Sequence, residues 1–78
     1  MNLGFVLIKA EPGYEHKVYN ELTKVEEIIQ IHPLSEEFDF IAKVEAENYE
    51  RFENIVKSKI KSINGILNIK TLTESKFY

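Results

Sequence analysis

The pattern of apolar and polar positions along the 78-residue chain predicts six elements in the order β-α-β-β-α-β. Continuous or alternating apolar runs, rich in isoleucine, valine and phenylalanine, predict strands at 3–9, 27–34, 38–45 and 66–73. In the third run, large apolar residues that include Phe38 alternate with charged ones, which is typical of a strand with one buried face.

Two helices are predicted between the strands, because apolar residues recur there three and four positions apart. The stripe of the first helix is Tyr14, Val18, Leu22 and Val25, and that of the second is Phe52, Val56, Ile60 and Ile63. Asn48 is placed to cap the start of the second helix. Gly65 is placed to end that helix in the left-handed conformation.

This order of elements predicts one α+β domain over residues 1–78 with the ferredoxin-like βαββαβ plait. Its four-stranded antiparallel sheet has the first and third strands in the middle, and both helices cover the same face. Residues 74–78 are predicted to be a loose tail.

The sheet face opposite the helices is predicted to carry apolar side chains that nothing in the chain covers. Phe5 and Leu7 point one way from the first strand, whereas Val6 and Ile8 point the other. Ile41 lies on the outer face of the third strand. A domain of this size buries only about 60% of its surface when it folds alone. We therefore predict a homo-oligomer with Phe5, Leu7 and Ile41 in a dimer interface, the alternative being scattered surface residues.

Composition narrows the possible partners. The net charge of −3 and the isoelectric point near 5.4 argue against electrostatic binding of nucleic acid or anionic membranes. Without cysteine there are neither disulfides nor thiolate metal sites. No run approaches the roughly 20 apolar residues of a membrane span, and the N-terminal run lacks the features of a signal peptide. We expect a cytoplasmic protein.

The residues do not indicate an enzyme. His16 and His32 fall on different elements, without metal-ligand spacing. The serines lack a nucleophile-elbow context, and there is no phosphate-binding glycine loop. Arg51, the only arginine, lies inside a predicted helix rather than in the oxyanion-binding loop of an acylphosphatase. The RNP1 pattern of RNA-recognition motifs is also missing. We expect no catalytic residues, no metal and no cofactor.

Three stretches, "FVLIKAEPGYEHKVYNEL", "IIQIHPLSEEFDFIAKVEAEN" and "VKSKIKSINGILNIKTLT", together cover most of the chain. In order and spacing they resemble the effector-binding (RAM) domain of the Lrp/AsnC regulator family. Members usually carry an N-terminal helix-turn-helix; here the first strand follows Met1 at once, so the resemblance implies a stand-alone domain. It also implies sheet-to-sheet dimers like a dimeric α-β barrel, assembled into rings that are commonly octamers. Small amino acids would bind between dimers.

The resemblance also implies a ligand site at the acidic turn. The family pattern Ser/Thr-Gly-x-x-Asp falls on residues 35–39, where Glu36 replaces the glycine. Of two family threonines on the last strand, the first is Ile69 here and the second is retained. The implied ligand-binding residues are Ser35, Glu36, Glu37, Asp39 and Thr71. The simpler interpretation of the turn is a solvated hairpin that keeps the sheet edge soluble.

Two functional hypotheses follow. In the first, the chain is a non-enzymatic domain that binds an amino acid and modulates transcription by co-assembling with full-length Lrp/AsnC-type regulators. Glu36 would then meet the ammonium group of the ligand or close the pocket. In the second, the chain is a structural homo-oligomerisation module without a ligand.

Overall fold

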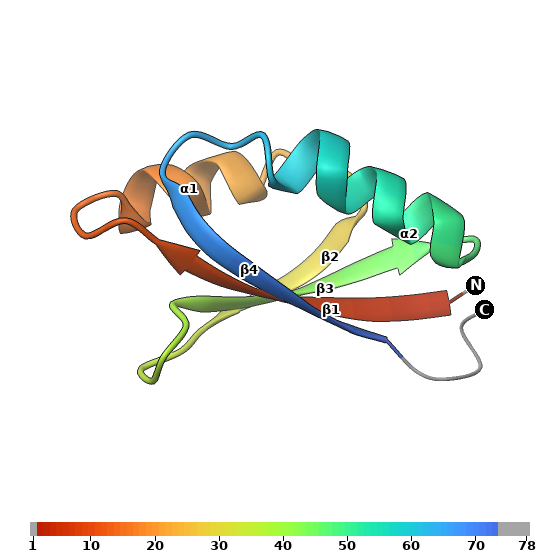
Figure 1. The fold of residues 1–78 in the computed structure, drawn as a ribbon, viewed down its shortest axis with the longest axis horizontal. Coiled ribbons are helices and arrows are strands. Elements are labelled where there is room, and N and C mark those ends of the chain that lie inside the picture. The colour runs from red at the N-terminus through yellow and green to blue at the C-terminus, as the bar shows by residue number, and fades with distance from the viewer. Residues whose placement is uncertain (1, 74–78) are drawn as a thin grey trace.

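The computed structural model describes residues 2–73, and the tail predicted at 74–78 lies outside the described residues. The elements are β1 (Asn2–Ala10), α1 (Glu15–Leu22), β2 (Ile28–Pro33), β3 (Phe40–Ala46), α2 (Tyr49–Ile55), the π-helical turn η1 (Val56–Ile60) and β4 (Ile66–Thr73). The sheet order is β2-β3-β1-β4, and each neighbouring pair is antiparallel. Both helices lie on one face of the sheet (Figure 1). The predicted plait is therefore confirmed.

The core lies between this sheet face and the helices. Alternate residues of β1 and β3 are buried there, including Val6, Ile8 and Val44. They pack against the buried side of the helices, where Leu22 and Phe52 are fully buried. Ile55, which the predicted stripe did not include, is also buried. The alternation of period two on the strands is what directs one set of side chains inward and the other set to the opposite face.

Of the two signals predicted at the ends of the second helix, the cap at Asn48 is confirmed and the end at Gly65 is wrong. The Asn48 side chain accepts a hydrogen bond from the Arg51 amide at 2.8 Å, which satisfies one free donor of the first turn. Gly65 does have the left-handed conformation, with φ of +102°, which a side chain rarely tolerates. The helical segment nevertheless ends earlier, at Ile60, with Lys61 as its right-handed C-cap, so Gly65 lies in the turn before β4. The first helix differs from the prediction, because Tyr14 precedes it and is 39% exposed. The Tyr14 side chain lies over Gly65 instead of inside the core.

The second helix continues as a π-helical turn, which its regular apolar spacing did not predict. The Lys61 amide donates to the Val56 carbonyl, five residues earlier, at 2.8 Å. Two serine hydroxyls bond back to carbonyls four residues earlier: Ser58 to Asn54 at 2.6 Å and Ser62 to Ser58 at 2.9 Å. Such back-bonding competes with the backbone ladder and accompanies the distortion.

The third strand begins at Phe40, two residues later than predicted. Phe38 is therefore half-buried in the turn and does not belong to the strand alternation. The reason is Asp39, whose side chain accepts a hydrogen bond from the Ala10 amide at 2.8 Å. This contact takes the place of the next ladder bond between β1 and β3.

Candidate functional site

The acidic turn at residues 34–39 connects β2 to β3 and is held against β1 by Asp39. The Asp39 amide donates to the Ile8 carbonyl, and its own carbonyl accepts from the Leu34 amide, both at 2.8 Å. Its carboxylate accepts from the Ala10 amide at 2.8 Å and lies 3.9 Å from Lys9 Nζ. One residue thus connects the turn to the end of the central strand.

An open cavity of about 380 Å³ adjoins this turn. It is lined by Lys9, Glu37, Phe38, Leu67 and Asn68, from the end of β1, the turn and the start of β4. The sheet register brings these segments together by pairing Lys9 with Asn68. The lining offers an amine, a carboxylate, an amide and two apolar groups, and its volume is in the range of small-molecule sites.

The structure brings together some of the predicted ligand residues and separates one. Glu37 lines the cavity and Asp39 anchors the turn. Ser35 and Glu36 are exposed on the turn. Thr71 pairs with Val6, further along the sheet than the positions of β1 that the turn contacts. Ligand binding by all five residues stays a prediction.

Four residues that line the cavity were not predicted as ligand residues: Lys9, Phe38, Leu67 and Asn68. Phe38 was instead expected on the alternating face of the third strand. Lys9 and Leu67 belong to strand ends that are 58 positions apart in the sequence, and no local motif marks either of them. The strand pairing itself is the only signal that could have found them, because the predicted plait places the first and last strands side by side.

The bare sheet face carries the side chains that were predicted for an interface. Leu7 pairs with Ile41 across β1 and β3, and Phe5, 37% exposed, lies beside them on the same face. Leu3 and Leu72 extend the patch, since Leu72 pairs with Phe5. We call these five residues the sheet patch. Its role in self-association stays a prediction.

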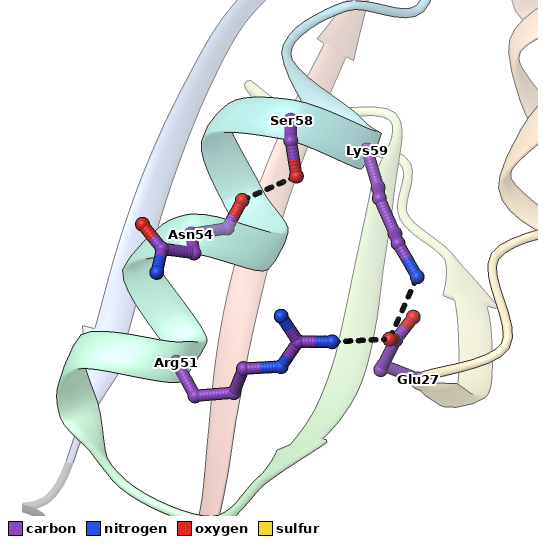
Figure 2. Close-up of polar contacts among 5 residues, drawn as sticks. All are labelled: Glu27, Arg51, Asn54, Ser58 and Lys59. Carbon is purple, nitrogen blue, oxygen red and sulfur yellow. Dashed lines mark hydrogen bonds and ion pairs between the residues drawn. The ribbon is translucent and has the colours of Figure 1, made fainter.

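A second polar cluster lies where β2 begins, at the far end of the β2–β3 pair from the acidic turn. Glu27 Oε2 accepts from Lys59 Nζ at 2.8 Å and lies 3.4 Å from Arg51 Nη2 (Figure 2). Its carboxylate therefore joins the start of β2 to both α2 and η1. The other oxygen, Oε1, is buried and has no hydrogen-bond partner among the described residues.

The ion pairs change the titration of Glu27. The hydrogen bond from Lys59 is the main cause that holds the pKa of Glu27 below its ordinary value of 4.5, whereas burial acts in the opposite direction. A lowered folded-state pKa adds stability above the unfolded pKa, and this contribution is lost as the pH falls through the folded pKa. Glu27 thus stabilises the fold at neutral pH and ceases to do so in acid.

We expect Glu27→Gln to lower the free energy of unfolding at pH 7 by about 1–2 kcal/mol. Hydrogen bonds to charged groups contribute roughly 1.5–3 kcal/mol, and the exposure of the Arg51 and Lys59 side chains reduces this value. The difference between parent and variant should shrink as the pH falls through the lowered folded-state pKa of Glu27, where the parent carboxylate becomes protonated. Urea unfolding at several pH values measures this difference. Glu21→Gln is the matched control: its pair with Lys24 is largely exposed, so we expect a change below about 0.5 kcal/mol. Equal effects of the two variants would contradict the assignment.

Residues 2–73 show no group of three or more His, Asp or Glu side chains that could hold a metal ion. Within the same range, no helix is long and apolar enough to cross a membrane.

Comparison with known proteins gives the family. The model of the Lrp/AsnC ligand binding domain matches residues 3–76. The HTH-type transcriptional regulator FL11 of Pyrococcus furiosus is 29% identical over 70 residues, which are 90% of this chain and 46% of the regulator. The chain thus spans about half the length of the curated relatives it matches.

Solved structures share the fold. The protein TTHA0845 from Thermus thermophilus superposes with a TM-score of 0.90 at 20% identity, over 100% of this chain and 98% of the other. The transcriptional regulator NMB0573 of Neisseria meningitidis, solved as an L-Met complex, gives a TM-score of 0.80 at 14% identity, over 90% of this chain and 47% of the other. With the family match over nearly its whole length, the chain belongs to the Lrp/AsnC ligand-binding domains of transcriptional regulators.

Proposed function

We propose that this chain is a non-enzymatic effector-binding and assembly domain. It binds a small amino acid at the acidic turn, between dimers, and acts on transcription by co-assembling with DNA-binding Lrp/AsnC-type regulators. The observation that carries the proposal is the family match over residues 3–76. The L-Met complex of the structural relative NMB0573 supports the choice of an amino acid as ligand.

The cavity beside the turn supports the same ligand class. An amino acid carries a carboxylate, an ammonium group and a side chain. Lys9 offers a cation for the first and Glu37 an anion for the second, while Phe38 and Leu67 offer apolar contact. An amino acid with an apolar side chain fits this combination best.

The exposure of the turn supports a site shared between chains. Glu36 is exposed, and Thr71 lies away from the turn of its own chain, so a neighbouring dimer would have to bring Thr71 to the ligand. Three carboxylates in five residues repel one another when a second copy approaches, unless an ammonium group or partner donors lie between them. Assembly beyond the dimer should therefore respond to salt, pH and amino acids.

A thermal-shift panel of the twenty amino acids tests the proposal. A ligand at a hundredfold excess over its Kd stabilises the folded state by about 2.7 kcal/mol. For a domain of this size that corresponds to a rise in Tm of about 10–20 °C. We expect such a rise with one or a few apolar amino acids and none with the corresponding amides, which lack the carboxylate. A panel without any shift would overturn amino-acid binding.

Glu36→Gly restores the residue that the family carries in this loop. Because Glu36 is exposed and the turn is held by Asp39, we expect the variant to keep its fold, with a change in Tm without ligand of less than about 4 °C. Its affinity for the amino acid, or the size of its assembly, should change about tenfold or more. Calorimetry and size-exclusion chromatography with light scattering measure both. Glu26→Gly is the matched control, because it removes an exposed carboxylate from the turn before β2, away from the acidic turn, and should change neither quantity.

One feature favours the alternative of a structural homo-oligomerisation module without a ligand. Glu36 stands where the family glycine allows close approach of a ligand to the backbone. In this second function the chain forms the same dimers, and neither Tm nor assembly size responds to any amino acid. The panel therefore discriminates the two functions.

A further inference from the structure

We propose that Lys43 and Glu45 set the register of the sheet-to-sheet dimer by forming two reciprocal ion pairs across it. The inference rests on the self-association proposed above. It identifies the residues that determine how the two copies align. It assigns a role to two charged residues on an otherwise apolar face.

Lys43 and Glu45 lie on the bare face of β3, within the area that a second copy would cover. The register pairs Lys43 with Phe5 and Glu45 with Leu3 of the sheet patch. Both charged side chains are already half-buried in a single chain. Neither takes part in any of the ion pairs found among the described residues.

Dimerisation would remove the remaining water from these two charges. A buried charge without a partner is strongly disfavoured, whereas a buried pair in good geometry is tolerated. A stable dimer therefore needs a carboxylate opposite Lys43 and a cation opposite Glu45. In a two-fold symmetric interface, the second copy can supply both from the same two residues.

The position of the two-fold axis along β3 determines whether Lys43 and Glu45 of the two copies lie opposite each other. For sheets packed with their strands nearly aligned and antiparallel, an axis across β3 at the level of Val44 places Lys43 against Glu45 of the second copy, and the reverse. An axis at the level of Lys43 places two lysines together. An axis at the level of Ala42 places Lys43 against Ile41. Only the first position satisfies both charges.

The apolar side chains fit the same axis. Val44 pairs with Gly4, so an axis at this level also passes between Leu3 and Phe5 on β1. The axis therefore exchanges these two positions, so Leu3 of one copy meets Phe5 of the other. Both side chains are 37% exposed in the single chain. One position of the axis thus pairs the charged side chains on β3 and brings the apolar side chains on β1 into contact.

Charge reversal tests the register, because the two reversed chains should complement each other. We expect Lys43→Glu and Glu45→Lys each to raise the Kd of the homodimer by roughly 30-fold or more. The double variant K43E/E45K should recover a Kd within about threefold of the parent. A mixture of the two single variants should form the heterodimer in preference to either homodimer, because both ion pairs are restored in it.

Sedimentation equilibrium gives the four Kd values, of the parent, the two single variants and the double variant. Native mass spectrometry gives the heterodimer, and circular dichroism confirms that each variant is folded. Dimerisation of the parent without recovery in the double variant or the mixture would overturn the register and leave the proposed dimer intact. A monomeric parent would overturn the proposed self-association and, with it, the register.

Discussion

Ile41→Asp is expected to convert the proposed dimer into a folded monomer. Ile41 lies on the bare face of β3, paired with Leu7, so a second copy would cover it on the proposed dimer. An aspartate there would be buried without a partner, at a cost of roughly 3–5 kcal/mol. Two copies of the change occur in each two-fold interface, so the Kd of the dimer should rise more than about a hundredfold.

The fold of the single chain should survive this change, because Ile41 points away from the core between the sheet and the helices. Sedimentation velocity at micromolar concentration measures the association, and circular dichroism measures the fold. Ile41→Val is the matched control, since it keeps an apolar side chain and should stay associated. An Ile41→Asp protein that sediments as a dimer would place the interface elsewhere.

Gly4→Ala should be the most damaging substitution of a single methyl group in the core. A Cβ at Gly4 would lie 2.8 Å from Cζ of Phe52 and in closer conflict with Cε1. Phe52 is fully buried and cannot move its ring into water. Overpacking of this kind costs typically 1–3 kcal/mol, and we expect about 3 kcal/mol here because the ring is confined on all sides. Urea unfolding measures the loss.

A second substitution separates this steric cause from a backbone effect. Gly4 does not have positive φ, so alanine is compatible with its backbone conformation. Phe52→Leu removes the part of the ring that meets the new methyl group. In the pair of Gly4→Ala with Phe52→Leu, the loss should be at least about 1 kcal/mol smaller than the sum of the single losses. Additive losses would refute the contact as the cause.

The fold was largely predictable because it depends on local signals that agree with one another. Alternation on the strands, three-and-four spacing on the helices, the cap at Asn48 and the positive φ of Gly65 each have a short-range physical cause. The π-helical turn did not follow from them, since Phe52, Val56 and Ile60 keep a spacing of four that an ordinary helix also has. The prediction for Tyr14 was wrong because its ring is apolar and it lies four residues before Val18, as a core-facing helical residue would. The spacing cannot distinguish that position from the observed one over Gly65.

The candidate site was less predictable because its contacts cross long stretches of sequence. The bond between Asp39 and the Ala10 amide joins residues 29 apart, and it moved the start of β3 past Phe38. Glu27 forms ion pairs with Arg51 and Lys59, which both belong to the second helix and its π-helical turn. No sequence motif predicts this cluster. The ligand-binding role of the acidic turn was predicted from the family resemblance. The other residues of the cavity were identified only from the register of the sheet, which brings β1 and β4 together.

Native mass spectrometry of the parent chain tests whether this domain both assembles and holds an amino acid. The protein would be sprayed from a volatile buffer that contains an equimolar mixture of the twenty amino acids. We expect dimers, or multiples of dimers, whose masses exceed the protein mass by whole numbers of one amino acid. Monomers without added mass would contradict it, and assemblies without added mass would leave only the structural module.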